Sequence, residues 1–205
     1  MHELLTKFER RAPAGSELPV LITPQAAGER LVDAWPRLSE LIESNLACVG
    51  GVLLRGFEVP SVEAFRGFAA AFGHPLLSYE FGSTPRSDVG GGVYTSTEYP
   101  AHQSIPLHNE QAYTREWPMK IWFHCMTAAP EGGETPIADS RAIYRKMPEH
   151  ILRRFEPGVR YVRNYGDFDV PWEKVFNTDR RDEVEAYCRR NDIRFEWDAE
   201  GGAAH

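Results

Sequence analysis

Apolar residues in the N-terminal third of the chain recur at helical spacing. Thr23-Pro24 has the form of a helix start, because threonine can cap the first turn and proline fits the first helical position. The apolar positions that follow are Leu31, Trp35, Leu38, Leu41 and Ile42. They predict an amphipathic helix that ends at Gly50-Gly51, with an interruption or restart at Pro36.

A short strand and a second helix are predicted next. Val52 to Leu54 is typical of a buried strand. Ser61 can cap a helix that Gly73 closes. The apolar stripe of this helix consists of Phe65, Phe68, Ala69 and Phe72. A stripe of this kind indicates a face packed in the core.

The pattern changes between residues 76 and about 138, where short apolar runs alternate with glycine and proline. This predicts strands and long loops. Helical signals return at Asp139-Ser140, which can cap a helix from about Arg141 to Phe155 that restarts at Pro148.

The C-terminal part predicts one more helix and one more strand. Thr178 or Asp179 can cap a last helix ending near Asn191, and Ile193 to Trp197 alternates as a strand does. Short strands with helices around them indicate an α+β or jelly-roll arrangement. We expect a single domain over residues 1–205.

Composition narrows the function classes. The net charge of −7 disfavours a general nucleic-acid binder, and no stretch has the roughly 20 apolar residues of a membrane span. Three widely spaced cysteines without a CxxC pair fit reduced thiols, so we expect a cytoplasmic protein. Arginine pairs occur at 153–154, 180–181 and 189–190, and they indicate either solvated helix faces or a docking patch for an acidic partner.

His108-Asn109-Glu110 carries the candidate chemistry. Residues two apart on a strand point to the same face, so the imidazole of His108 and the carboxylate of Glu110 can hold one metal ion. These are two thirds of the facial triad of non-haem Fe(II) oxygenases. With 7 His and 30 Asp and Glu in the chain, chance alone supplies about one such pair. The surrounding sequence therefore decides the interpretation.

The surrounding sequence resembles the taurine dioxygenase/clavaminate synthase-like (TauD/TfdA) family of Fe(II)- and 2-oxoglutarate-dependent oxygenases. The matching segments are Arg55-Gly56-Phe57, Ser96 to Pro100, Leu107 to Glu110, Gly132 to Arg141, and Tyr161 to Tyr165. They look most similar to the syringomycin-type branch, which hydroxylates amino acids in peptide natural-product pathways. The resemblance implies a double-stranded β-helix (jelly-roll) core flanked by helices.

The resemblance also implies roles for individual residues. His108 and Glu110 would be iron ligands, and Thr135 would bind the distal carboxylate of the cosubstrate 2-oxoglutarate. Gln103 and Ser104 fall where relatives place groups that contact the substrate. Related halogenases lack the carboxylate ligand, so Glu110 favours hydroxylation.

The function implied is a 2-oxoglutarate-dependent non-haem iron dioxygenase. It would hydroxylate an amino acid, free or tethered to an acidic carrier protein, in peptide antibiotic or siderophore biosynthesis. The alternative is an inactive jelly-roll remnant that acts as a small-molecule-binding module. A zinc hydrolase is less favoured, because no HExxH pattern occurs.

The chain departs from the family pattern after Trp197. Family members have a second ligand histidine downstream and then an arginine that clamps 2-oxoglutarate, and neither is present at the expected position. His124 could approach the pair across a hairpin, but a packed histidine is the favoured interpretation. We therefore expect the sequence to be a C-terminally truncated or frameshifted form of a longer hydroxylase.

Overall fold

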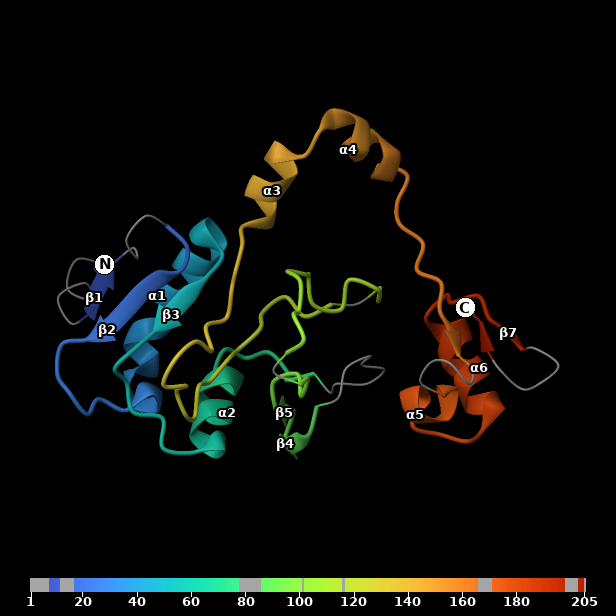
Figure 1. Ribbon diagram of the computed structural model, residues 1–205. Helices are drawn as coiled ribbons and strands as arrows, with labels where there is room; N and C mark the ends of the chain where they lie inside the picture. The colour runs from blue at the N-terminus through green and yellow to red at the C-terminus, as the bar shows by residue number, and fades with distance from the viewer. Residues whose placement is uncertain are drawn as a thin grey trace. The chain divides into compact units, whose positions relative to one another are not determined.

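The chain divides into two compact units, and Figure 1 labels helices and strands of both. The computed structural model describes residues 8–11, 17–77, 86–100, 102–115, 117–165, 171–197 and 203–204. Unit 1 comprises Met1–Leu76, Val89–Val93 and Ile121–Met147. Unit 2 comprises Leu77–Asp88, Tyr94–Lys120 and Pro148–His205.

A three-stranded sheet forms one layer of unit 1. Its central strand, β2 (Val20–Pro24), pairs antiparallel with β1 (Phe8–Arg11) and parallel with β3 (Val52–Leu54). Val20 and Ile22 alternate with less buried neighbours and face the core, with exposures of 3% and 0%. The alternation fixes which face of β2 receives the helices.

Helix α1 (Leu31–Val49) packs on this core face. Its buried positions are Leu31, Ala34, Leu38, Ile42 and Asn45. The predicted end is confirmed, because Gly50 adopts the left-handed conformation with φ 93°. The predicted start at Thr23-Pro24 is wrong, since both residues belong to β2. The predicted interruption at Pro36 is also wrong, because α1 continues through it.

Helix α2 (Val62–Ala70) completes the core of unit 1. The predicted cap is confirmed, because the Ser61 hydroxyl accepts a hydrogen bond from the amide of Ala64 at 3.2 Å. Phe68 is 1% exposed, and its ring centroid lies 5.9 Å from that of Trp122. Through Trp122, the segment after residue 120 packs against α2. Beyond α2, strands β4 (Asp88–Gly90) and β5 (Val93–Tyr94) form a two-stranded sheet.

The helices predicted between residues 139 and 155 are confirmed. Asp139 caps α3 (Ser140–Lys146) by accepting from the amide of Arg141 at 2.9 Å, and α4 (Glu149–Phe155) begins after Pro148. Asp139 and Pro148 therefore act locally as the sequence predicts.

Unit 2 has its own small core. Helices α5 (Trp172–Phe176) and α6 (Arg181–Arg190) accompany a sheet in the order β6 (Asn164–Tyr165), β8 (Ala203–Ala204), β7 (Glu196–Trp197). Its buried residues are Tyr165, Trp172, Val175, Val184 and Cys188. The last predicted helix is confirmed within two residues of its start, whereas the predicted strand from Ile193 is reduced to β7.

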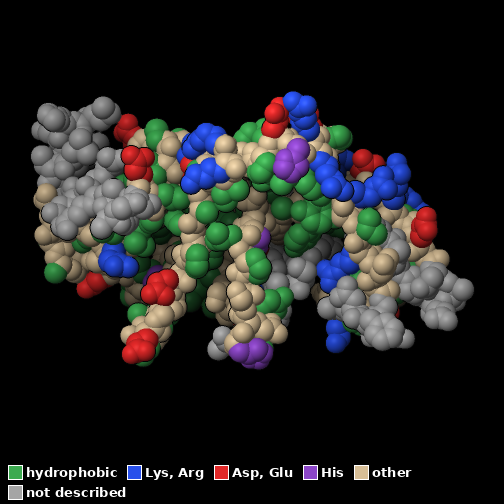
Figure 2. All heavy atoms as spheres, turned by 45° about the horizontal axis from the view of Figure 1, so that its top comes forward, with side chains coloured by type: hydrophobic (Ala, Val, Ile, Leu, Met, Phe, Trp, Pro, Cys, Tyr) green, Lys and Arg blue, Asp and Glu red, His purple; other side chains and the backbone are tan. Residues whose placement is uncertain are grey.

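The strands expected between residues 76 and 138 are largely missing from the described residues. Only β4 and β5 are found there, and the described residues form three small sheets rather than a double-stranded β-helix. Large hydrophobic side chains reach the surface (Figure 2). Those exposed by more than three fifths are Leu107, Met119, Phe123, Met126, Tyr144, Val159 and Val162. None of the helices in the described part of the chain is long and apolar enough to cross a membrane.

Candidate functional site

His108 and Glu110 lie in irregular backbone rather than in a strand. Residues 103–109 have no ladder partner, and a turn begins at Glu110, with Gln111 in the left-handed region at φ 50°. The expected strand is therefore wrong for this segment. The expected proximity is confirmed, because Nε2 of His108 lies 3.6 Å from Oε2 of Glu110.

The hydrogen bonding of His108 assigns its ring nitrogens. Nδ1 lies 2.8 Å from the carbonyl oxygen of Pro106, which can only accept, so Nδ1 carries the hydrogen and donates it. In the neutral ring, Nε2 then has a lone pair directed to the side of Glu110. A backbone carbonyl behind the ligating imidazole is the usual arrangement at metal centres.

The two donor atoms suit one divalent cation. At 3.6 Å they are too far apart for a direct hydrogen bond. Two donors bound at adjacent octahedral positions, each about 2.1 Å from the ion, lie about 3 Å apart, so a small approach would let both atoms bind one ion. His108 is 57% exposed and Glu110 is 24% exposed, so the pair can be reached from solvent. Within the described ranges, no group of three or more His, Cys, Asp and Glu side chains could hold a metal ion.

Sequence reasoning missed Arg86, which also contacts Glu110. Its Nη2 lies 3.4 Å from Oε1 of Glu110, whereas the His108 contact is to Oε2. Arg86 is 24 residues away in sequence. No local pattern signals such a contact, because a tertiary approach rather than helix or strand spacing produces it.

The proposed substrate-contacting residues lie upstream on the same segment of unit 2. Gln103 and Ser104 are both exposed, and the amide of Gln103 donates to the carbonyl of Pro100 at 2.9 Å. This bond turns the chain just before the extended stretch that leads to His108. The assigned substrate role of both residues stays a prediction.

Thr135 belongs to unit 1, whereas the His108–Glu110 pair belongs to unit 2. The threonine is exposed and follows two glycines with φ of 70° and 78°. A Cβ at Gly133 would lie 2.9 Å from Cβ of Ala129, so the turn before Thr135 requires glycine. The role of Thr135 in binding 2-oxoglutarate stays a prediction.

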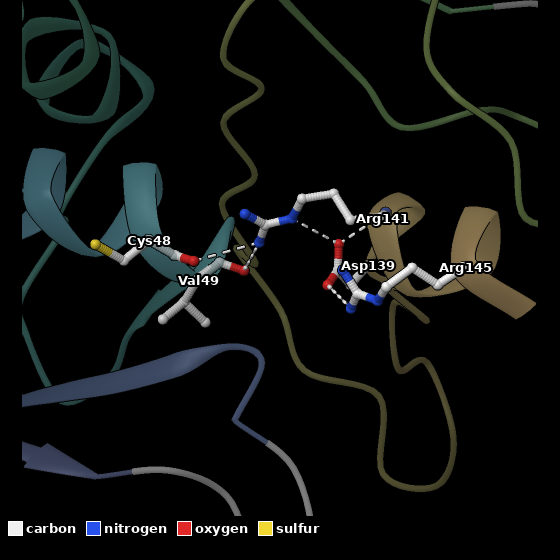
Figure 3. A network of polar contacts seen from close by, with 5 residues as sticks. All are labelled: Cys48, Val49, Asp139, Arg141 and Arg145. Atoms are coloured by element: carbon white, nitrogen blue, oxygen red, sulfur yellow. Dashed lines mark hydrogen bonds and ion pairs between the residues drawn. The ribbon is translucent and has the colours of Figure 1, made fainter.

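An arginine network anchors the segment that follows Thr135 (Figure 3). Nη2 of Arg141 donates to the carbonyl oxygens of Cys48 at 3.3 Å and Val49 at 3.5 Å, at the C-terminal end of α1. Helix ends have unpaired carbonyls and attract cations, and the last turn of α1 has no basic residue of its own. Arg141 also donates through Nε to Asp139 at 3.1 Å. This bond is the main cause that lowers the pKa of Asp139.

His124 is engaged in packing. Its ring is stacked on Phe65 with centroids 5.3 Å apart and an interplanar angle of 28°. Both residues belong to unit 1. The contact supports the interpretation of His124 as a packed histidine.

The chain is similar in sequence to a known family and to known proteins. The sequence profile described as "Taurine catabolism dioxygenase TauD, TfdA family" matches residues 21–200. The dapdiamide synthesis protein DdaC of Enterobacter agglomerans is 40% identical over 158 residues, covering 76% of this chain and 48% of that protein. A clavaminate synthase-like protein of Arabidopsis thaliana is 38% identical over 173 residues, covering 79% and 52%. The chain spans about half the length of these curated relatives.

Proposed function

Since the chain belongs to the TauD, TfdA dioxygenase family, we propose that it is an Fe(II)- and 2-oxoglutarate-dependent hydroxylase. Its substrate would be an amino acid or a carrier-bound aminoacyl group in cytoplasmic secondary metabolism. The observation that carries the proposal is the convergence of His108 Nε2 and Glu110 Oε2, 3.6 Å apart. The family and the clavaminate synthase-like relative imply a jelly-roll fold.

The residues of this chain would divide the work as follows. Bound Fe(II) and 2-oxoglutarate would supply the oxygen activation and the oxidation of a substrate C–H bond. His108 would bind iron through Nε2, because the Pro106 carbonyl keeps the hydrogen on Nδ1. Glu110 would add a carboxylate oxygen, which a halogenase of this lineage lacks. Thr135 would donate its hydroxyl hydrogen to the distal carboxylate of 2-oxoglutarate.

The substrate class is supported by a relative and by the residues near the pair. The 40% identical relative is named for dapdiamide synthesis, in agreement with the amino-acid hydroxylase branch. Gln103 and Ser104 would present polar groups to the amino acid or its thioester. The chain offers arginines to an acidic carrier, although Arg153 and Arg189 already form ion pairs with glutamates of their own helices. The carrier is therefore the less supported part of the proposal.

Succinate release tests this function. The assay supplies Fe(II), 2-oxoglutarate and a panel of amino acids, each free and tethered to a carrier protein. We expect one class of amino acid to stimulate succinate release and to gain one oxygen atom in the mass spectrum. His108→Ala and Glu110→Ala variants should abolish both signals. Absence of stimulated release across the panel would contradict the proposal.

A small-molecule-binding module is the second candidate function. It is favoured by one observation: within the described residues, only two ligands converge, and two ligands bind metal weakly. Calorimetry with 2-oxoglutarate, with and without Mn(II), separates the two functions. A hydroxylase should bind 2-oxoglutarate more tightly when the metal is present, whereas a metal-independent module should bind its ligand equally well without it.

A further inference from the structure

The two carboxylate oxygens of Glu110 face different partners. Oε2 lies 3.6 Å from His108 Nε2, and Oε1 lies 3.4 Å from Nη2 of Arg86. The nearest contact of the guanidinium is therefore to one carboxylate oxygen, and that of the imidazole is to the other. The carboxylate is held on one side by a cation of the protein and presents its other oxygen to the candidate metal position.

The Arg86–Glu110 pair is more enclosed than typical surface pairs. Its side chains are 19% and 24% exposed, whereas those of the Arg153–Glu149 pair in the same unit are 69% and 74% exposed. An exposed ion pair hardly fixes the orientation of its two side chains, because solvent screens the charges and both side chains stay mobile. An enclosed guanidinium fixes the orientation of its partner much better.

A hydrogen-bonded cluster positions the backbone beside Arg86. The amide of Ser87 donates to the hydroxyl oxygen of Thr95 at 2.9 Å. The hydroxyls of Ser87 and Thr95 donate to Oε1 of Glu98 at 2.8 Å and 2.7 Å. These bonds lower the pKa of Glu98, with the bond from Thr95 as the main cause. The carboxylate of Glu98 thus ties residue 87 to the segment that leads towards His108.

We propose that Arg86 is a positioning residue for Glu110. It holds Oε1, so that Glu110 offers a single oxygen to the metal, on the side of His108. The inference rests on the proposed function, in which Glu110 is a metal ligand. It adds a contact outside the ligand set and gives Glu98 in the Ser96 to Pro100 motif a structural role, as part of the support for Arg86.

The test compares Mn(II) affinities of the 205-residue chain, measured from the electron paramagnetic resonance signal of free Mn(II). Arg86→Met removes both the charge and the donors. We expect it to weaken Mn(II) binding about 10- to 100-fold, the usual effect of removing a residue that hydrogen-bonds to a metal ligand. Arg86→Lys keeps the charge and one point of contact, so it should recover part of the affinity. Arg153→Met is the matched control, because it breaks an exposed pair in the same unit, and it should leave the affinity unchanged.

The opposite outcome is also informative. If Arg86 competed with the metal for Glu110, Arg86→Met would tighten Mn(II) binding, and this result or an unchanged affinity would overturn the inference. Glu98→Gln is a second variant that leaves the guanidinium in place, and it should weaken binding in the same direction. Glu110→Gln separates the proposed metal site from the proposed role of Arg86. If Glu110→Gln leaves the affinity unchanged, the proposed metal site itself is refuted, whereas a loss in Glu110→Gln without one in Arg86→Met refutes only the role of Arg86.

Discussion

Replacing Arg141 tests whether its guanidinium stabilises the fold by capping the C-terminal end of α1. Arg141→Met removes a guanidinium that donates to the carbonyls of Cys48 and Val49. A cation at a helix C-terminus stabilises by about 0.3–1 kcal/mol, and a hydrogen bond contributes about 0.5–1.5 kcal/mol net. Both distances are long, and the side chain is 56% exposed, so the lower ends of these ranges apply. We expect the free energy of unfolding to fall by about 1 kcal/mol.

Urea unfolding followed by circular dichroism measures this change, and a melt should show a midpoint lower by about 2–4 °C for a chain of this size. Arg145→Met is the matched control in the same helix, because Nη2 of Arg145 makes only a 3.9 Å contact with Asp139. Its effect should be clearly smaller. Equal effects of the two substitutions, or no effect of Arg141→Met, would refute the reasoning that the guanidinium caps α1.

Three further predictions concern pH, thiol reactivity and His124. Since Arg141 lowers the pKa of the Asp139 carboxyl in the folded state, the charge of Asp139 stabilises the fold above the ordinary carboxyl pKa and ceases to do so as the pH falls through the lowered value. Asp139→Asn keeps an oxygen that can cap α3. It should therefore be less stable than the parent chain at pH 7 but equally stable in strong acid. A difference in urea midpoints that does not change with pH would contradict this. Cys188 is 1% exposed, and burial raises the pKa of its thiol. Iodoacetamide should therefore modify the exposed Cys48 and Cys125 first in the native protein, and all three cysteines in urea. Equal modification rates in the native protein, measured by mass spectrometry, would contradict the burial of Cys188. His124→Ala should lower the melting temperature through loss of the stack on Phe65 while Mn(II) affinity stays unchanged, and a lost affinity would instead make His124 a ligand.

Local signals allowed most of the helices to be predicted, because caps and stripes act within a few residues, but α5 was not predicted. Ser61 and Asp139 cap the helices that their positions predict, and Gly50 ends α1. The helix start predicted at Thr23-Pro24 was wrong because the same two residues also fit the end of a strand. The pairing of β2 with β3, about 30 residues away in sequence, decides between these structures, and the local pattern contains no information about it.

The candidate site was predictable only in part. The sequence predicted that the side chains of His108 and Glu110 would lie close together, and they do so in irregular backbone rather than in the expected strand. Recognition of the family from its motifs is confirmed by the match over residues 21–200. Arg86 could not be foreseen, since its contact with Glu110 depends on tertiary folding. The roles of Thr135, Gln103 and Ser104 stay predictions.

The central claim is that His108 and Glu110 bind one metal ion together. Electron spin-echo envelope modulation of Mn(II) bound to the chain detects a nitrogen attached to the ion. The account predicts modulation from one imidazole nitrogen, its loss in His108→Ala, and weaker Mn(II) binding in Glu110→Gln. Bound Mn(II) without nitrogen modulation, or with modulation that persists in His108→Ala, would contradict the claim.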